Sequence, residues 1–311
     1  MIKTGRQNTG DRIQETKNGK ALHWVFCLLS SVFCILPFAL QATPEKTLIY
    51  ARGKDSIKLD PADITDGESA KATTQIFDTL VRYKADSTEV EPSLAIAWEC
   101  SADGLAWTFH LRQGVKFHDG TPCDAHAVVF SFERQRNEKH PAHTGDFIYW
   151  RDLFAAVEKT EAEDAKTVRF TLKHPYAPFL SNLAMFSAAV ISPASFDKHG
   201  KGIAQNPVGT GPFRFESWER DARIVLSANP DHWDGRPKVD RLILQVIPDN
   251  TTRFLRLKDR KIHLIDGLAP QHVPEVKKDG NLVLYEAPGM NLAYLAFHNE
   301  KPPFMDARVR Q

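Results

Sequence analysis

Several side chains that can bind transition metals are gathered in one short stretch of the sequence. They are His110, His118, Asp119, Cys123 and His126. Imidazole and thiolate groups are the ligands that zinc and nickel favour in proteins. However, we expect His110 on the polar face of a strand and His126 at the start of a helix. A metal site is therefore the alternative interpretation, and we predict a structural role and no metal.

A glycine-rich segment offers a second kind of chemistry. Gly209-Thr210-Gly211-Pro212 could cradle a phosphate, but the segment lacks the Gly-Lys-Ser/Thr ending and no long helix is predicted after it. We therefore interpret the glycines as residues that let the backbone turn at a junction between two parts of the structure. The sequence also shows no pairing of a nucleophile with a base, so we do not predict an enzyme.

The elements that would position the first group of residues lie between Glu91 and Gly120. Ser101–Gly104 has the composition of a tight turn. After it, apolar and polar residues alternate, which predicts a strand with one buried face formed by Trp107, Phe109 and Leu111. A further turn leads to 115–117, which we predict as a third strand. The stretch therefore predicts an antiparallel meander.

Apolar periodicity predicts alternating strands and helices along the remaining chain. The predicted strands are 47–50, 167–172, 188–191, 213–215, 223–226, 242–247 and 262–265. The predicted helices are 72–80, 124–136, 179–185 and 251–257, with Asp124 as an N-cap and a long loop at 137–150. Strands interleaved with helices predict mixed α/β lobes.

Two sequence blocks resemble the motifs of a known family. The first has an Ala-x-x-Trp strand, a Ser-x-Asp-Gly turn, a Trp-x-Phe-x-Leu-Arg strand and then Gly-x-x-Phe-His-Asp-Gly; the second is 206–213. They are similar to the signatures of the family 5 extracellular solute-binding proteins, which are peptide-, nickel- and haem-binding receptors of ATP-driven (ABC) importers. Residues 124–136 and 288–295 also match blocks of the family, and all four blocks occur in the same order as in its members. The resemblance covers residues 46–311. Among the members, the dipeptide-binding receptors look closest.

The resemblance implies a fold and a division into domains. The implied fold class is α/β, a type II periplasmic binding protein-like lobe with an inserted mixed α+β subdomain. Lobe one would comprise 43–77 and 209–288, and the inserted subdomain 78–208. Residues 289–311 would begin a second lobe that is otherwise truncated. His118-Asp119-Gly120 belongs to the family's structural framework, including members that bind peptides.

The resemblance also implies a ligand-binding loop. Thr65, Asp66 and Gly67 match a loop that lines the ligand cleft, mostly through backbone groups; the alternative is a solvent-facing turn. The implied ligands are dipeptides or short oligopeptides, delivered by a monomeric receptor to an inner-membrane ABC permease, with no cofactor. A metal- or haem-binding receptor is the alternative. No residues match the acid and the arginine that hold the ends of a dipeptide, so we expect weak or no binding by this chain.

Residues 1–42 have the composition of a signal peptide. Basic residues predominate in the first twenty positions, 21–40 is largely apolar, and Pro37 precedes a small-residue cleavage site at Ala42. A membrane anchor is the alternative, because the apolar segment approaches the ~20 residues that cross a bilayer. We predict cleavage and export to the periplasm.

The charge balance argues against a polyanionic partner. The chain has 40 Lys and Arg against 39 Asp and Glu, without the basic stripe of a nucleic-acid binder. Cys100 and Cys123 would remain after cleavage of the signal peptide. They could form a disulfide in an oxidising compartment, but the sequence does not place their Cα atoms within bonding distance. Their pairing stays open.

Overall fold

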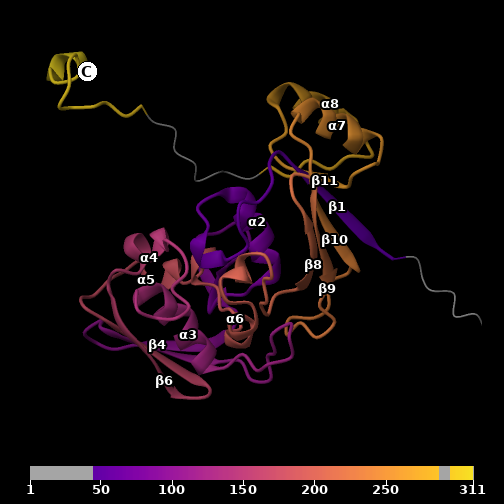
Figure 1. The fold of residues 1–311 in the computed structure, drawn as a ribbon. Coiled ribbons are helices and arrows are strands. Elements are labelled where there is room, and N and C mark those ends of the chain that lie inside the picture. The colour runs from indigo at the N-terminus through magenta and orange to yellow at the C-terminus, as the bar shows by residue number, and fades with distance from the viewer. Residues whose placement is uncertain (1–44, 287–294, 311) are drawn as a thin grey trace, which may run out of the picture. The chain divides into compact units, whose positions relative to one another are not determined.

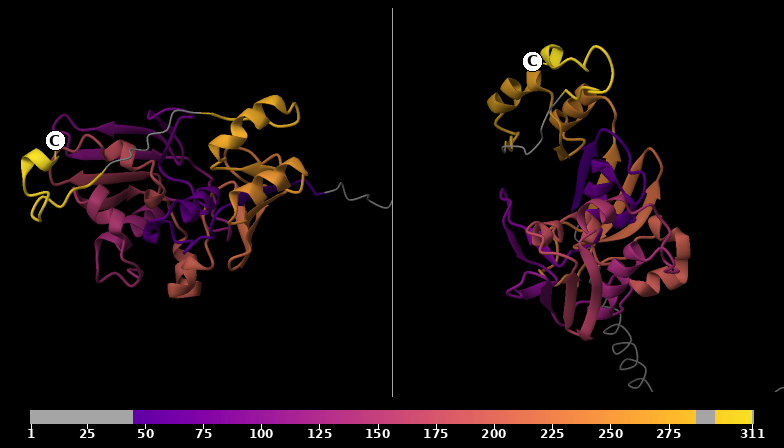
Figure 2. Two further views of the ribbon diagram at one scale, coloured as in Figure 1. Left: turned by 90° about the horizontal axis from the view of Figure 1, so that it is seen from above. Right: turned by 90° about the vertical axis from the view of Figure 1, so that its left-hand side faces the viewer.

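The computed structural model describes residues 45–286 and 295–310. The predicted signal peptide, 1–42, lies outside the described residues, as does most of the 288–295 block. The described strands form three sheets. Figure 1 labels strands of the two larger ones, and Figure 2 shows the same ribbon from two further sides. One has five strands, one has four, and the third is a hairpin of β2 (Val81–Tyr83) and β3 (Val90–Pro92).

The five-stranded sheet combines the first strand of the described chain with four strands from residues 213–265. Its order is β11-β1-β10-β9-β8, with β1 parallel to both β10 and β11 and the other neighbours antiparallel. Alternate residues such as Ile224 and Leu226, or Leu242 and Leu244, are buried because successive side chains point to opposite faces. The strands are β1 (Thr47–Arg52), β8 (Phe213–Glu219), β9 (Arg223–Ala228), β10 (Arg241–Val246) and β11 (Leu264–Ile265).

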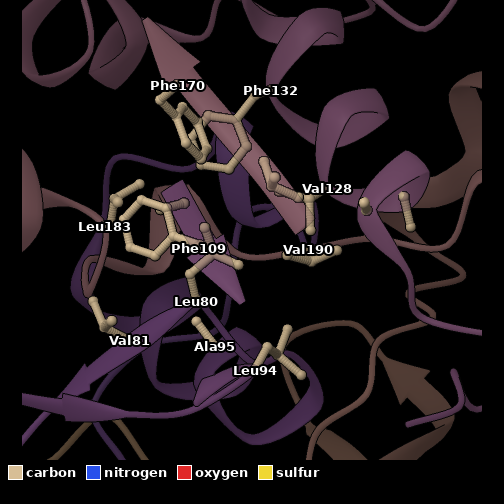
Figure 3. Close-up of a cluster of buried hydrophobic side chains, with 14 of the residues drawn as sticks. Leu80, Val81, Leu94, Ala95, Phe109, Val128, Phe132, Phe170, Leu183 and Val190 are labelled. Atoms are coloured by element: carbon tan, nitrogen blue, oxygen red, sulfur yellow. The ribbon is translucent and has the colours of Figure 1, made fainter. Parts of the chain in front are cut away.

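The four-stranded sheet lies wholly between residues 95 and 172. Its order is β4-β5-β7-β6 and every pair is antiparallel, with β4 at Ala95–Cys100, β5 at Ala106–Leu111, β6 at Val157–Asp164 and β7 at Thr167–Leu172. Helix α3 (Ala125–Arg136) packs against it, and Asp124 caps the helix by accepting the Ala127 amide at 3.1 Å. Figure 3 shows Phe132 of α3 beside Phe170 of β7, with ring centroids 4.9 Å apart.

Shorter helices complete the described chain. Figure 1 shows α7 and α8 beside the β11 end of the five-stranded sheet. The helices are α2 (Gly67–Ile76), α4 (Ile148–Leu153), α5 (Phe179–Asn182), α6 (Pro193–His199), α7 (Asn250–Lys258), α8 (Val273–Lys278) and α9 (Ala307–Arg310). Single 3₁₀ turns occur at Pro61–Asp63, Phe186–Ala188, Gly200–Ala204 and Pro270–His272.

The predicted meander is wrong in its third strand. β5 has β7, not 115–117, as its second neighbour. Residues 116–122 instead close a small loop on themselves, with a bridge between Lys116 and Pro122 and a hydrogen bond from the Phe117 amide to the Thr121 carbonyl at 2.8 Å. β7 offers a full-length partner to β5, and a three-residue segment cannot compete with it.

Other predicted elements differ at their ends. The helix predicted at 72–80 is α2 at 67–76, and the strand predicted at 188–191 is a 3₁₀ turn followed by extended chain. The predicted loop 137–150 ends inside helix α4, and 262–265 forms only the two-residue strand β11. The strands near 47, 167, 213, 223 and 242 and the helices near 125, 179 and 251 are confirmed.

The two cysteines left open by the sequence are both free. Cys100 is exposed at the end of β4, while Cys123 is buried. Burial raises the pKa of the Cys123 thiol well above its ordinary value, so this thiol stays protonated. Within residues 45–286 and 295–310, no helix has the length and apolar character to cross a bilayer.

Candidate functional site

The candidate site lies where parallel strands of the five-stranded sheet end. β1 runs parallel to β10 and β11, so the carboxyl ends of these strands meet at one edge of the sheet. In open α/β sheets, ligands bind outside the carboxyl ends of the strands. β1 ends at Arg52, and Asp266 follows β11 directly. These two residues connect the sheet edge to helix α2.

Arg52 fixes the beginning of helix α2 against the end of β1. Its side chain is fully buried, and Nη1 donates to the Glu68 carbonyl at 2.7 Å and to Ser56 Oγ at 3.0 Å. Nη2 pairs with Asp55 Oδ1 at 3.1 Å. Burial lowers the pKa of the Arg52 guanidinium, while the charges of Asp55 and Glu68 oppose that shift. The contacts hold the first turn of α2 in a defined place.

Thr65, Asp66 and Gly67 form the entry to this helix. Asp66 is the N-cap, and its Oδ1 accepts the Ser69 amide at 2.8 Å. Gly67 is the first helical residue, so the expectation that all three residues form a loop is wrong at Gly67. Asp is a favoured N-cap residue, so Asp66 was a signal in the sequence for a helix that begins at Gly67.

The surface at this helix end is open. Thr65 and Gly67 are exposed, and a Cβ built on Gly67 would have no atom within 4 Å. Thr65 and Asp66 line a pocket of about 180 Å³ together with Lys58, Asp63, Asp146 and three isoleucines. The first amides of a helix lack intrahelical partners and carry partial positive charge. A carboxylate or carbonyl oxygen of a ligand could therefore accept hydrogen bonds here.

A chain of paired charges borders the opening. Lys71 Nζ lies 2.9 Å from Glu68 Oε1 and also pairs with Asp266. Burial opposes the charge of Lys71, but the hydrogen bonds to Asp266 and Glu68 raise the pKa of its ammonium above the ordinary value. Burial and a hydrogen bond to Asp266 raise the pKa of Tyr50 to about 12. These groups are held in fixed protonation states, which suits a binding wall rather than proton transfer.

Sequence reasoning missed Tyr50, Arg52, Glu68, Lys71 and Asp266. Arg52 and Asp266 could have been noticed in the sequence. Each is a charged residue that directly follows the apolar part of a strand, β1 for Arg52 and β11 for Asp266. Their convergence depends on the parallel pairing of strands that are more than two hundred residues apart in the sequence. No local pattern encodes that pairing.

The residues proposed as alternative metal ligands do not converge. His110 is partly exposed on β5 and His126 is exposed on α3. Asp119 accepts from Ser192 Oγ at 2.6 Å and from Thr121. In the described part of the chain, no group of three or more His, Cys, Asp or Glu side chains could hold a metal ion.

Instead, His118 joins the two sequence blocks. Its amide donates to the Gly209 carbonyl at 2.9 Å, and Nε2 donates to the Gly211 carbonyl at 2.9 Å. Burial lowers the pKa of His118 to about 4. The ring is therefore neutral near pH 7 and acts as a structural donor.

The glycine-rich segment packs against the end of helix α2. A Cβ on Gly209 would lie 2.2 Å from the Ile76 carbonyl oxygen, and one on Gly211 would lie 2.6 Å from the Ile76 carbonyl carbon. The Gly211 amide donates to that same Ile76 oxygen at 2.9 Å. The chain bends at 210–212, as predicted, but the glycines also meet a second constraint: neither has a positive φ, and close approach to the helix excludes a side chain.

Comparisons with known proteins identify the family of the chain. The sequence profile of the bacterial extracellular solute-binding proteins, family 5 middle, matches residues 89–311. The chain belongs to this family. The predicted type II periplasmic binding protein fold, with mixed α/β content, is confirmed for the part that the chain covers. The family consists of solute-binding proteins and is not an enzyme family.

Relatives within the family bind different ligands. The chain is 38% identical to heme-binding protein A of Haemophilus influenzae over 291 residues, covering 87% of this chain and 53% of that protein. It is 35% identical to the dipeptide-binding protein of Escherichia coli K12 over 303 residues, covering 91% and 56%. A periplasmic binding protein, DppA, of Helicobacter pylori, solved with the peptide STSA, matches with a TM-score of 0.72 and 38% identity, covering 76% and 50%. The chain spans about half the length of the relatives it matches.

Proposed function

We propose that this chain supplies one wall of a periplasmic receptor that binds dipeptides or short oligopeptides for an ATP-driven importer. The supporting observation is the open N-terminus of α2 at Thr65, Asp66 and Gly67, held beside the carboxyl ends of β1 and β11. A peptide presents carbonyl and carboxylate oxygens, which the partial positive charge of a helix N-terminus attracts.

The proposal includes the wider context of the receptor. The receptor would act as a monomer in the periplasm and deliver its ligand to an inner-membrane permease. Residues 43–77 and 209–288 would form its first lobe, 78–208 an inserted subdomain, and 289–311 the beginning of a second lobe. In support, the five-stranded sheet uses only residues 47–52 and 213–265, and the four-stranded sheet only 95–172.

One wall alone should bind weakly. A ligand held by one wall would stay in contact with water on its other side, and a charge-assisted hydrogen bond contributes only ~1.5–3 kcal/mol. Association costs at least ~4 kcal/mol, which is more than one such bond contributes, so we expect a dissociation constant weaker than ~1 mM for this chain.

A titration of ¹⁵N-labelled chain with alanyl-alanine tests the proposal. The amide resonances of Gly67 and Glu68 should shift. Gly67→Pro removes the first amide donor at a position where helices accept proline, and it should reduce the shifts. The matched control, Gly67→Ala, keeps the donor and has space for its methyl group, so it should behave like the parent chain. Equal shifts in both variants, or shifts confined to amides elsewhere in the chain, would contradict the proposed role.

Haem binding is the second candidate, because one of the relatives at 38% identity is a heme-binding protein. Haemin titration of the same protein, followed by its visible absorbance, distinguishes the two. A saturable spectral change with haemin, without amide shifts from the dipeptide, would favour the haem receptor.

A further inference from the structure

The end of the β8–β9 hairpin, residues 218–222, contacts the segment that connects β1 to helix α2. This hairpin end is not part of the pocket at Thr65 and Asp66. The connecting segment leads from Arg52, at the end of β1, to Ile57, which does line that pocket. The contact could therefore fix the position of the proposed peptide wall from outside the pocket.

Asp55 is the centre of this contact. Its side chain is only 7% exposed. Oδ1 accepts from Arg52 Nη2 at 3.1 Å and from the Ser56 amide at 2.8 Å. Oδ2 accepts from the indole N–H of Trp218 at 3.0 Å and from the Asp221 amide at 2.9 Å. One carboxylate therefore joins the segment after β1 to the end of the hairpin.

The hairpin end is shaped to present these two donors. Asp221 has a φ of 58°, in the left-handed region that residues with a Cβ adopt at a cost. The hydrogen bond from its amide to Asp55 offsets that cost. The guanidinium of Arg220 lies over the ring of Trp218, with Cζ 3.5 Å from the ring centroid. This cation–π contact holds the indole in place while its N–H donates to Asp55.

Arg52 carries the contact from Asp55 to the first turn of α2. Its Nη1 donates to the Glu68 carbonyl at 2.7 Å. The guanidinium is fully buried, and a buried charge is stable only when it is paired. Asp55 Oδ1 lies 3.1 Å from Nη2, whereas the carboxylate of Glu68 lies 4.0 Å from Nη1. Asp55 is therefore the nearer counter-charge, and it orients Arg52 toward the helix.

A second contact from the hairpin reaches the pocket directly. Arg220 Nη1 donates to the Ile57 carbonyl at 3.1 Å. The Ile57 amide donates to Ser69 Oγ at 2.8 Å, and the Ser69 amide donates to the N-cap Asp66 at 2.8 Å. The hairpin end is thus connected to the first turn of α2 by two chains of hydrogen bonds.

We propose that Asp55 is a positioning residue for the peptide wall, and that Trp218 controls ligand affinity through it without lining the pocket. The inference rests on the proposed function, which places the wall at Gly67. A binding site keeps its geometry when surrounding hydrogen bonds hold the groups that contact the ligand. Loss of the Trp218 N–H should loosen Asp55 and Arg52, and with them the first turn of α2.

Trp218→Phe tests this coupling, because it keeps an aromatic ring and removes the N–H that Asp55 accepts. Amide hydrogen exchange is measured on the ¹⁵N-labelled full chain without ligand. The amides of Ser69 and Ala70 donate to Asp66 in the first turn of α2. They should exchange about threefold or more faster than in the parent chain.

The last turn of α2 provides an internal reference. The Phe77 amide donates to the Thr73 carbonyl at 2.9 Å, and its exchange should be unchanged in Trp218→Phe. A general loss of stability would accelerate exchange at both ends of the helix. Asp55→Asn removes the counter-charge of Arg52, so it should accelerate exchange in the first turn more than Trp218→Phe does.

Titration with alanyl-alanine links the coupling to binding. The shift of the Gly67 and Glu68 amides per added dipeptide should be about threefold or more smaller in Trp218→Phe than in the parent chain. The matched control, Trp98→Phe, removes an indole N–H on the four-stranded sheet. It should give parent values for exchange and for the shifts.

Two results would overturn the inference. They are unchanged exchange of the Ser69 and Ala70 amides in Trp218→Phe, and an equal acceleration at Phe77.

The inference and the proposed function fail separately. Dipeptide-induced shifts confined to amides far from Gly67 would contradict the peptide wall. Faster exchange confined to the first turn of α2 in Trp218→Phe would then still support Asp55 as the residue that positions this turn.

Discussion

His118 shows how one side chain connects distant parts of this sequence. It lies in the His118-Asp119-Gly120 turn, and both its amide and its ring donate to carbonyls of the glycine-rich segment. Its Nδ1 is buried without a hydrogen-bond partner among the described residues. Protonation of the ring would therefore place an unpaired N–H and a charge in the interior, which explains the low pKa of this residue.

The low pKa predicts loss of stability in acid. The pKa of His118 is about 4 in the folded state against 6.5 ordinarily, so the unfolded chain binds the proton first as the pH falls. The His118 pKa difference therefore contributes about 3 kcal/mol to the free energy of unfolding. This contribution is complete above about pH 6.5 and is lost as the pH falls towards 4.

Urea unfolding across this pH range measures the effect. His118→Gln keeps an N–H donor but does not titrate, and it should lose about 3 kcal/mol less than the parent chain between pH 6.5 and 4. The control His110→Gln changes a partly exposed histidine and should follow the parent chain. If the free energy of unfolding fell equally with pH in His118→Gln and in the parent chain, His118 would not be the source of this pH dependence.

Trp107 is a second residue whose role can be tested. It is partly buried in the core of the four-stranded sheet, with its ring 5.7 Å from that of Phe179 and 6.4 Å from that of Phe109. Trp107→Ala should lower the free energy of unfolding by about 3 kcal/mol, because it removes apolar area and leaves a cavity. Thermal unfolding measures the loss. Tyr285→Ala, at a residue that is 86% exposed, should stay within about 0.5 kcal/mol of the parent chain. Similar melting temperatures for the two variants would contradict the assigned face of β5.

At the scale of elements, the two ends of helix α2 have different roles. Its N-terminus is open at Gly67 and forms the proposed peptide wall. Its C-terminus is covered by Gly209 and Gly211, whose backbone approaches Ile76 too closely for any side chain. The helix is therefore held at both ends, by Arg52 at its first turn and by the glycine-rich segment at its last, but only its N-terminus has an open surface.

This packing predicts a cost for any side chain at Gly211. In Gly211→Ala the new methyl group would lie 2.6 Å from the Ile76 carbonyl carbon, so the segment must move away from α2. We expect a loss of about 1–3 kcal/mol in the free energy of unfolding, measured by urea denaturation. Gly280→Ala is the matched control, because its methyl group would meet no atom within 4 Å. Equal stabilities of the two variants would show that the segment does not press on the helix.

At the scale of the whole molecule, the described residues form one compact unit that contains separate hydrophobic cores. One core contains Phe109, Phe132 and Phe170 and belongs to the four-stranded sheet, while another contains Ile224, Leu226 and Leu244 of the five-stranded sheet. The glycine-rich segment links them, since it bonds to His118 on one side and to Ile76 on the other.

Export is the prediction at this scale. The basic start and apolar segment of residues 1–42 predict cleavage after Ala42, although these residues lie outside the described part of the chain. When the chain is expressed in a bacterium with a periplasm, the mass of the periplasmic protein should correspond to a chain that begins at Thr43. Retention in the membrane after an alkaline wash, with the mass of the full chain, would instead indicate an anchor.

The sequence by itself determined most elements, the family and the buried face of β5. These features depend on local periodicity and on motifs such as Trp-x-Phe-x-Leu-Arg, which residues close in the chain define. The N-cap of α3 at Asp124 was predicted for the same reason.

Only the tertiary structure decided which strands pair and which side chains meet. β7 displaced 115–117 as the neighbour of β5, and the parallel pairing of β1 with β11 brought Asp266 to Lys71. The real constraint on Gly209 and Gly211 is an approach to Ile76, which lies far away in the sequence. Pairing and close contact depend on the free energy of the whole fold, whereas periodicity depends only on neighbours along the chain.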